Sequence, residues 1–332
     1  MPELRRDPVL GRWIIISKER RKRPSDFTIE THTSLGGFCP LCPGNENTTP
    51  PEVLAYKLGG DRGPNKPGWQ VRVVPNKYPA LVIEGDLGKE GEGLYDRMNG
   101  IGAHEVIVES PNHDESLTQM PPEKIFFVLK AFKERIVDLE KDPRFRYVMV
   151  FKNYGRAAGA SLEHSHSQLI ALPVLPRMIV SELAGSLSYF QYKERCVFCD
   201  IIRQEMQQNV RVVCQNEHFI TITPFAPRTP FEMWVLPKQH SSAYNRIDDF
   251  HILSLSSQFS ETLRRLNACI PNVPYNFVLH TEPLRFGGVE HFHWHFEIVP
   301  KLTSIAGFEW GSGFYINPMP PEEAAEYLRE AL

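Results

Sequence analysis

The strongest constraint on this chain is a pattern that occurs twice in the same order. A Cys-x-x-Cys pair is followed far downstream by a segment in which histidines alternate with other residues. The first copy joins Cys39–Cys42 to His164–Gln168, and the second joins Cys196–Cys199 to His291–Glu297. Two such pairings in one order favour a duplicated metal-binding domain over a chance arrangement.

Bulk composition narrows the class of protein. The chain has 332 residues, which is long enough for two domains of ordinary size. With 42% hydrophobic residues and a net charge of -3, it is expected to bind neither membranes nor nucleic acid. The first residues lack the apolar core of a signal peptide, so a cytoplasmic enzyme is expected. In the cytoplasm, Cys-x-x-Cys pairs are more typical of metal ligands than of disulfides.

Hydrophobic periodicity predicts the same succession of elements in both copies. In the first, strands are expected near 71–74, 104–109, 147–151 and 167–172, with a helix over 122–139. The second repeats this with strands near 219–223, 231–235, 275–279 and 292–299, and a helix over 250–266. Residues 43–67 and 81–103 are interpreted as loops, and 174–195 as a link between the copies. The pattern predicts an α+β fold of two tandem domains, 1–180 and 181–332, each an antiparallel sheet with a long helix.

Each copy offers the four Cys or His ligands that structural zinc usually takes. The first set is Cys39, Cys42, His113 and His164, and the second is Cys196, Cys199, His240 and one of two later histidines. Aligning Pro173 with Pro300 selects His291, whereas aligning Gln168 with Glu297 selects His293. The second alignment is preferred because Gln and Glu are nearly isosteric. Two zinc ions per chain are therefore expected, and the alternative for each cysteine pair is a set of buried core thiols.

The first histidine segment also carries a candidate nucleophile. His164 and His166 alternate on a predicted strand, so both point to one face. If a metal holds His164, then His166 has a fixed orientation and can attack phosphorus to form a covalent intermediate. Gln168 lies on the same face, where its amide can donate to a phosphoryl oxygen. The small, polar run 153–161 could supply further donors to phosphates, while Lys152 and Arg156 are interpreted as solvated surface cations.

At these residues the chain resembles the galactose-1-phosphate uridylyltransferase family of the histidine-triad superfamily. The resemblance covers nearly the whole chain. Its motifs are Arg6–Ile14, Cys39–Cys42, Ser110–His113, Phe151–Asn153, His164–Gln168, Gly307–Glu309 and Tyr315–Pro318.

The resemblance implies a homodimer of two histidine-triad-like halves and a ping-pong reaction through a nucleotidyl-histidine. It assigns the nucleophile to His166, a zinc ligand to His164, and the residue that distinguishes transferases from hydrolases to Gln168. It also implies nucleotide contacts from Asn76, Asn153 and Ser161. The C-terminal segment, with Phe308, Tyr315 and Asn317, is expected to contact the sugar phosphate, across the dimer interface in one version.

Two departures bear on the substrate. Ser165 stands between the histidines where uridylyltransferases commonly have Pro, and Cys196 and Cys199 are kept where some members lack cysteines. Both features also resemble the plant-type ADP-glucose phosphorylase branch. The leading prediction is a uridylyltransferase that uses UDP-glucose and galactose 1-phosphate, and the alternative is a phosphorylase that uses ADP-glucose and phosphate. A zinc-stabilised nucleotide-binding protein without turnover, or a nucleotide hydrolase, ranks below both.

Overall fold

A single ten-stranded sheet dominates the computed structural model, which describes residues 1–17, 19, 23–27, 37–57, 59 and 63–332. Its strand order is β10-β11-β12-β14-β13-β8-β9-β7-β4-β3, and every neighbouring pair is antiparallel. The strands of the first half are β3 (Leu54–Lys57), β4 (Trp69–Pro75), β7 (Ala103–Val108), β8 (Tyr147–Tyr154) and β9 (His166–Leu172). Those of the second half are β10 (Val212–Gln215), β11 (Phe219–Ile222), β12 (Met233–Pro237), β13 (Tyr275–His280) and β14 (His295–Pro300).

The two halves meet in the middle of this sheet, where β8 of the first pairs with β13 of the second. Outward from that seam, the strands follow in corresponding order: β9 and β14, β7 and β12, β4 and β11, β3 and β10. The α+β class with antiparallel sheets predicted from the sequence is confirmed. The division at residue 180 stays a prediction.

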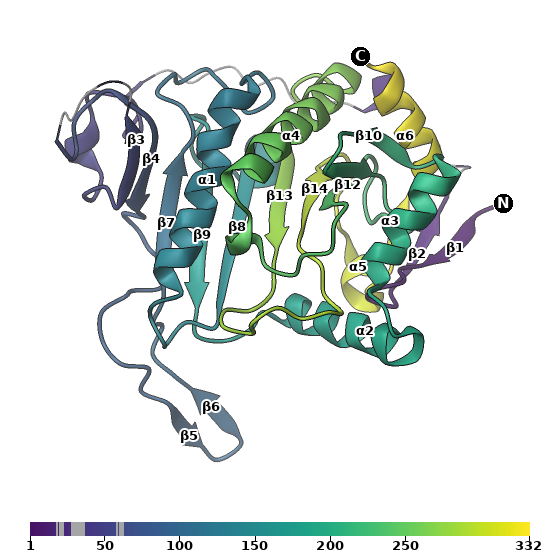
Figure 1. The fold of residues 1–332 in the computed structure, drawn as a ribbon, viewed down its shortest axis with the longest axis horizontal. Coiled ribbons are helices and arrows are strands. Elements are labelled where there is room, and N and C mark those ends of the chain that lie inside the picture. The colour runs from purple at the N-terminus through teal and green to yellow at the C-terminus, as the bar shows by residue number, and fades with distance from the viewer. Residues whose placement is uncertain (18, 20–22, 28–36, 58, 60–62) are drawn as a thin grey trace.

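Two long helices cover one face of the sheet, here called the helix face (Figure 1). They are α1 (Pro122–Leu139) and α4 (Asp249–Cys269), one from each half. Alternate strand residues such as Val150, Leu169 and Phe277 pack with them into the largest hydrophobic cluster. Because strand side chains alternate, the residues between them lie on the opposite face, here called the site face. His166 and Gln168 belong to the site face, since Ser167 and Leu169 lie on the other.

The site face is covered in the second half and much less so in the first. Helix α3 (Val197–Gln208) packs Phe198 and Ile202 onto Ile220 and Trp234 of the second half. Every residue of β12 is buried, whereas β8 and β9 alternate between buried and partly exposed residues. The sequence thus builds one closed and one accessible half from matching strands.

Smaller elements complete the chain. A three-stranded sheet joins β1 (Glu3–Arg6), β2 (Trp13–Ile16) and β15 (Tyr315–Asn317). Further helices in the described ranges are α2 (Arg177–Lys193), α5 (Gly307–Ser312) and α6 (Pro321–Glu330), with 3-10 turns at Pro24–Asp26, Glu46–Thr48, Arg156–Ala158 and Tyr244–Arg246. No helix in the described ranges combines the length and apolar character that a membrane crossing requires.

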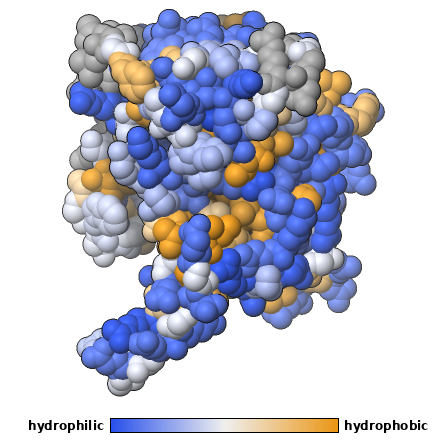
Figure 2. Space-filling model, turned by 90° about the vertical axis from the view of Figure 1, so that its left-hand side faces the viewer, coloured by the Kyte–Doolittle hydropathy of each residue, from blue (hydrophilic) through white to orange (hydrophobic). Residues whose placement is uncertain are grey.

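Three segments differ from the sequence interpretation. The link 174–195 contains the helix α2, and the loop 43–67 contains the short edge strand β3. The loop 81–103 carries a hairpin of β5 (Glu90–Glu92) and β6 (Tyr95–Arg97) that projects from the body (Figure 1). Figure 2 shows this projecting arm covered largely by hydrophilic residues. Its strands are only three residues long, too short for periodicity to reveal.

Candidate active site and metal centres

The four predicted ligands of the first half converge. The ligand atoms of Cys39, Cys42, His113 and His164 all lie within 4.8 Å of one another. Cys42 Sγ is 3.3 Å from His113 Nδ1 and 3.5 Å from His164 Nδ1. A tetrahedral zinc ion with ordinary Zn–S and Zn–N bond lengths separates such atoms by about 3.5 Å. The donor set and its spacing therefore fit a structural zinc ion.

The hydrogen bond of His164 directs it at this cluster. Its Nε2 lies 2.7 Å from the carbonyl oxygen of Ser110, to which a protonated Nε2 donates. The Nδ1 lone pair then faces the cysteine sulfurs, which is the form of histidine that binds a metal. His164 itself is buried and lies just before β9, two residues ahead of His166.

The second half repeats this geometry. Cys196, Cys199, His240 and His293 form a group of the same spread, with Cys199 Sγ 3.5 Å from His240 Nδ1 and 3.7 Å from His293 Nδ1. His293 Nε2 donates to the carbonyl oxygen of Pro237 at 2.8 Å. His291 lies elsewhere, with its Nδ1 3.0 Å from Ser186 Oγ. The structure therefore places His293 in the cluster, as the alignment of Gln168 with Glu297 predicts.

His166 is the first residue of β9, and its ring has a defined proton arrangement. Nδ1 lies 2.8 Å from the carbonyl oxygen of His164, to which it donates. The lone pair is then on Nε2, the atom that can attack an electrophile. Burial, and next the positive charge of Lys152, lower the pKa of His166, which favours the neutral ring.

The other predicted nucleotide contacts lie on β9, on the neighbouring β8, after β4 and in the turn before His164. Gln168 follows two residues later and is partly exposed. Asn153 lies on β8, where its Oδ1 accepts from Asn276 Nδ2 at 2.8 Å. Ser161 is exposed in the turn that leads to His164, and Asn76 follows β4 directly. The chain turns before Ser161 at Gly155 and Gly159, whose φ angles of 79° and 88° favour glycine.

Lys152 corrects the sequence interpretation, because it is not a surface cation. Its side chain is 1% exposed on the helix face, and Nζ donates to Glu109 Oε2 at 2.6 Å. It also donates to Ser165 Oγ at 3.1 Å and to the carbonyl oxygen of His166 at 2.9 Å. Arg156 is exposed, as expected.

This buried ion pair also accounts for Ser165 in the place of a proline. Ser165 Oγ donates to Glu109 Oε2 at 2.6 Å, and Ser167 Oγ donates to Glu109 Oε1. A proline has no hydroxyl group and could not join this network. The side chains between His164, His166 and Gln168 thus anchor the strand from behind, while the histidines and Gln168 face the site.

The positions that match His166 and Gln168 in the second half hold a different arrangement. His295 stacks on His280, with ring centroids 4.6 Å apart. His280 Nδ1 is 2.9 Å from Glu182, and Glu297 is 2.5 Å from Arg228. All five side chains are buried or nearly so, and the ligand atoms of Glu182, His280 and His295 also lie within 4.8 Å of one another. The sequence interpretation missed Glu182 and His280, whose elements are far apart in the chain.

The C-terminal residues lie beside the second half. Asn317 is buried on β15 and donates to the carbonyl oxygen of Pro227 at 3.1 Å. Tyr315 packs beside Ile14 and Ala226, with the Arg12 guanidinium 5.6 Å from its ring centroid. Phe308 is 48% exposed on α5. Tyr315 and Asn317 thus contact the second half and the N-terminal strands, while Phe308 packs against Phe314.

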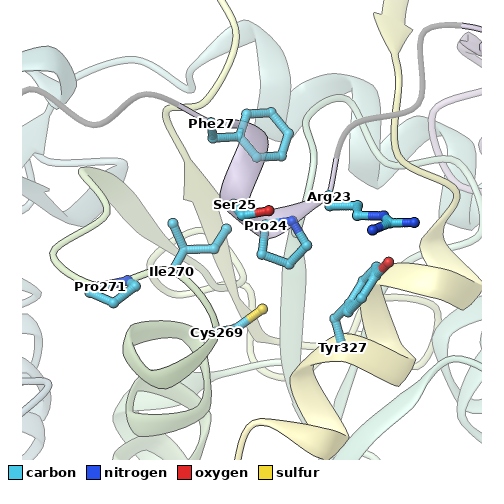
Figure 3. A pocket seen from close by; sticks show the side chains of 8 residues that line it. All are labelled: Arg23, Pro24, Ser25, Phe27, Cys269, Ile270, Pro271 and Tyr327. Carbon is cyan, nitrogen blue, oxygen red and sulfur yellow. The ribbon is translucent and has the colours of Figure 1, made fainter.

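A separate pocket of about 530 Å³ lies between the N-terminal segment, the end of α4 and α6. Figure 3 shows its lining, which includes Arg23, Phe27, Cys269 and Tyr327. None of its lining residues belongs to the predicted site. Burial raises the pKa of the Cys269 thiol to about 12, so this cysteine is not a reactive thiolate.

The sequence of this chain is similar to those of known nucleotidyl-transferring enzymes. The sequence model described as galactose-1-phosphate uridyl transferase, N-terminal domain, matches residues 1–176. A model for a domain of unknown function matches residues 109–332. The chain is 38% identical to ADP-glucose phosphorylase of Arabidopsis thaliana, over 99% of this chain and 93% of that protein. It is 29% identical to galactose-1-phosphate uridylyltransferase of Thermotoga maritima, over 99% and 98%.

The fold is also similar to those of solved structures of the same kinds of enzyme. An ADP-glucose phosphorylase from Arabidopsis thaliana with bound ADP-glucose superimposes with a TM-score of 0.84 and 36% identity, covering 99% of this chain and 98% of that one. A uridylyltransferase superimposes with a TM-score of 0.77 and 30% identity, covering 100% and 98%.

Proposed function

Since the chain belongs to the galactose-1-phosphate uridylyltransferase family, we propose that it transfers nucleotidyl groups through a covalent intermediate on His166. The observation that carries this proposal is the state of the His166 ring. Its Nδ1–H is engaged by the His164 carbonyl oxygen, so Nε2 presents a lone pair. The matching His295 makes the same Nδ1 hydrogen bond, but its ring is buried and stacked on His280.

The reaction has two displacements at one phosphorus atom. In the first, the Nε2 lone pair attacks the α-phosphorus of a nucleotide sugar, and the phosphorus–oxygen bond to the β-phosphate breaks. The sugar 1-phosphate leaves with the electron pair. In the second, an oxygen of the acceptor phosphate attacks the same phosphorus, and the phosphorus–nitrogen bond breaks, which returns the lone pair to Nε2. Gln168 donates an amide N–H to a phosphoryl oxygen in both displacements.

For the substrates, we propose ADP-glucose as donor and phosphate as acceptor, with ADP and glucose 1-phosphate as products. The uridylyltransferase reaction ranked first by sequence becomes the second candidate. The relatives favour this order, since identity is 38% to an ADP-glucose phosphorylase and 29% to a uridylyltransferase, both over nearly the whole chain. Ser165 is a second reason, because it stands where uridylyltransferases commonly have Pro and so resembles the ADP-glucose phosphorylase branch. Its hydroxyl group takes part in hydrogen bonds with Glu109 and Lys152.

An assay with both nucleotide sugars tests this choice. We expect phosphate-dependent release of glucose 1-phosphate from ADP-glucose, and a much slower reaction with UDP-glucose and galactose 1-phosphate. The reverse preference would restore the uridylyltransferase. A labelled, acid-labile nucleotidyl adduct that is lost in His166→Ala tests the covalent step. Nucleotide binding without any adduct or turnover would instead favour a zinc-stabilised binding protein.

We also propose that both Cys₂His₂ clusters bind zinc in a structural role. Their donor types favour zinc over harder ions, and zinc there would hold the strands that carry His166 and His295. Such ligands need reduced thiols, which is consistent with a cytoplasmic protein. The expected content is two zinc ions per chain.

Asn76, Asn153 and Ser161 are proposed to contact the nucleotide and its phosphates. Asn153 lies on β8 beside β9, Asn76 contacts the His104 ring next to Gln168, and Ser161 is exposed in the turn before His164. Phe308, Tyr315 and Asn317 are proposed to contact the sugar phosphate of the partner subunit in a homodimer. The contacts of Tyr315 and Asn317 with the second half of their own chain and with the N-terminal strands support this assignment. Light scattering, together with complementation between His166→Ala and Phe308→Ala chains, tests it.

A further inference from the structure

A histidine outside the His-x-His-x-Gln segment contacts the amide of Gln168. His104 lies on β7, where it pairs with Ile170, and the neighbouring Val106 pairs with Gln168. His104 and Gln168 are therefore diagonal neighbours on the site face. His104 Nε2 lies 2.8 Å from Gln168 Oε1.

The backbone decides which nitrogen of His104 carries the proton. The N–H of Ala80 donates to His104 Nδ1 at 3.1 Å, so Nδ1 must carry a lone pair. In the neutral ring the proton is then on Nε2, which donates to the Gln168 oxygen. The Asn76 amide nitrogen also lies 3.2 Å from Nε2, but Asn76 Oδ1 accepts from the Tyr78 N–H. Of these two amides, Gln168 is the one that offers Nε2 an acceptor.

We propose that His104 is a positioning residue that fixes the orientation of the Gln168 amide, so that its NH₂ group faces the transferring phosphoryl group. This inference rests on the proposed function. An amide turned the other way would put its NH₂ group against the N–H of His104 and lose this hydrogen bond. Its oxygen would then face the phosphoryl oxygens, which carry negative charge.

The fixed orientation has a second consequence, which concerns water. A glutamine oxygen that faced the phosphorus could accept a hydrogen bond from water and orient it for attack. Water would break the phosphorus–nitrogen bond, release the free nucleoside monophosphate and return the lone pair to His166. Because the Nε2–H of His104 already donates to that oxygen, the geometry favours transfer to an acceptor over hydrolysis. The matching Glu297 instead pairs with Arg228, at 2.5 Å.

The test measures how the covalent intermediate partitions between phosphate and water. His104→Phe keeps a ring of similar size and removes the donor, whereas His104→Gln keeps an amide donor at the same position. After formation of the labelled adduct, rapid quench gives its rates of transfer and of hydrolysis. We expect His104→Phe to slow transfer by about 10- to 100-fold and to raise the hydrolysed share. The KM for the nucleotide sugar should change little, and His104→Gln should recover most of the transfer rate.

The double variant His104→Phe, Gln168→Ala separates positioning from a loss of folding. If His104 acts through Gln168, the double variant is no slower than Gln168→Ala alone. An unchanged partition in His104→Phe, or losses that multiply in the double variant, would overturn the proposal. If the His104→Phe chain does not fold, the transfer rate and the partition of His104→Gln are compared with those of Gln168→Ala. Values near those of the wild type support the proposal, and a loss as large as that of Gln168→Ala opposes it. Absence of any adduct in the wild-type enzyme would contradict the proposed function itself, which is a different result.

Discussion

His166 and Gln168 stand at the start of β9 in the first half, and His295 and Glu297 take the same places on β14 in the second. Each histidine donates Nδ1–H to the carbonyl oxygen two residues earlier. That earlier residue is itself a histidine in a cluster of two cysteines and two histidines. The scaffold is therefore shared down to single hydrogen bonds.

The difference lies in what surrounds the two strands. On the site face, Gln168 is neutral and partly exposed, whereas Glu297 is buried against Arg228 and near His280. Behind β9 on the helix face, the ion pair of Lys152 and Glu109 anchors the strand. The comparison teaches that ion pairs on the helix face leave the site face of β9 neutral and partly exposed, while on β14 the ion pairs fill the site face itself.

The largest expected difference between the halves is in catalysis. His166→Ala should reduce nucleotidyl transfer by at least about 10³-fold, because the nucleophile is lost. His295→Ala should stay within about 10-fold of the wild type, since His295 is buried among neighbouring rings and bonded to the backbone of His293. Steady-state rates, with circular dichroism to verify folding, measure both. Similar losses in the two variants would contradict a single type of nucleophile.

Removing one metal centre at a time tests whether the shared scaffold needs both. Cys39→Ala and Cys196→Ala should each lower the zinc content from two ions to one. Each should also reduce the free energy of unfolding by about 5 kcal/mol or more, because metal binding is coupled to folding. Cys39→Ala should lose more activity, since His164 and His166 are two residues apart. Elemental analysis and denaturant unfolding check this, and a wild type without zinc would disprove both centres.

Much of this comparison could be predicted from the sequence because its signals are local or repeated. The structure begins and ends α1 at the predicted residues, since Pro122 marks its start and an apolar stripe runs through it. The two groups of Cys and His residues could be predicted because both halves carry them in the same order. By contrast, α2 buries only Ile179, Glu182 and Ser186 on its inner side, so it has little apolar periodicity to detect.

The parts that the sequence could not supply depend on contacts between distant strands. Lys152 and Glu109 are 43 residues apart, and only the pairing of β7, β9 and β8 brings them together. Glu182 and His280 are 98 residues apart. The residues around a lysine on a strand do not show whether its side chain pairs with a buried carboxylate or extends into water. The alternation of Lys152 with Val150, a core residue, was the one available signal.

Breaking the ion pair behind β9 tests its anchoring role. Lys152→Met leaves Glu109 buried without a cation and should reduce the free energy of unfolding by about 3–5 kcal/mol. The double variant Lys152→Met, Glu109→Gln should regain part of this loss. Lys130→Met, which removes a more exposed pair with Asp249, should change stability by less than about 1 kcal/mol. Equal effects of Lys152→Met and Lys130→Met in urea unfolding would show that burial of the pair contributes nothing.

The smallest expected effect concerns pH and the locked second half. Burial alone lowers the pKa of His280, but the carboxylates of Glu182 and Glu297 outweigh it and raise the pKa to about 10. The other ring facing it is His295, and Arg228 pairs with Glu297. Because the folded pKa lies above the unfolded value, the stabilisation is complete below about pH 6.5 and is lost as the pH rises through about 10.

The resulting slope can be isolated with one variant. From pH 7 to pH 8, the contribution of His280 should fall by about 1.2 kcal/mol, because the folded state keeps a proton that most of the unfolded chains have released. In Glu182→Gln the folded pKa of His280 drops towards the unfolded value, so the stability difference between wild type and variant should shrink steadily over this range. Urea unfolding at closely spaced pH values measures that difference. A difference that stays constant with pH would mean that His280 is neutral in the folded protein, and that the second half is locked by packing and not by charge.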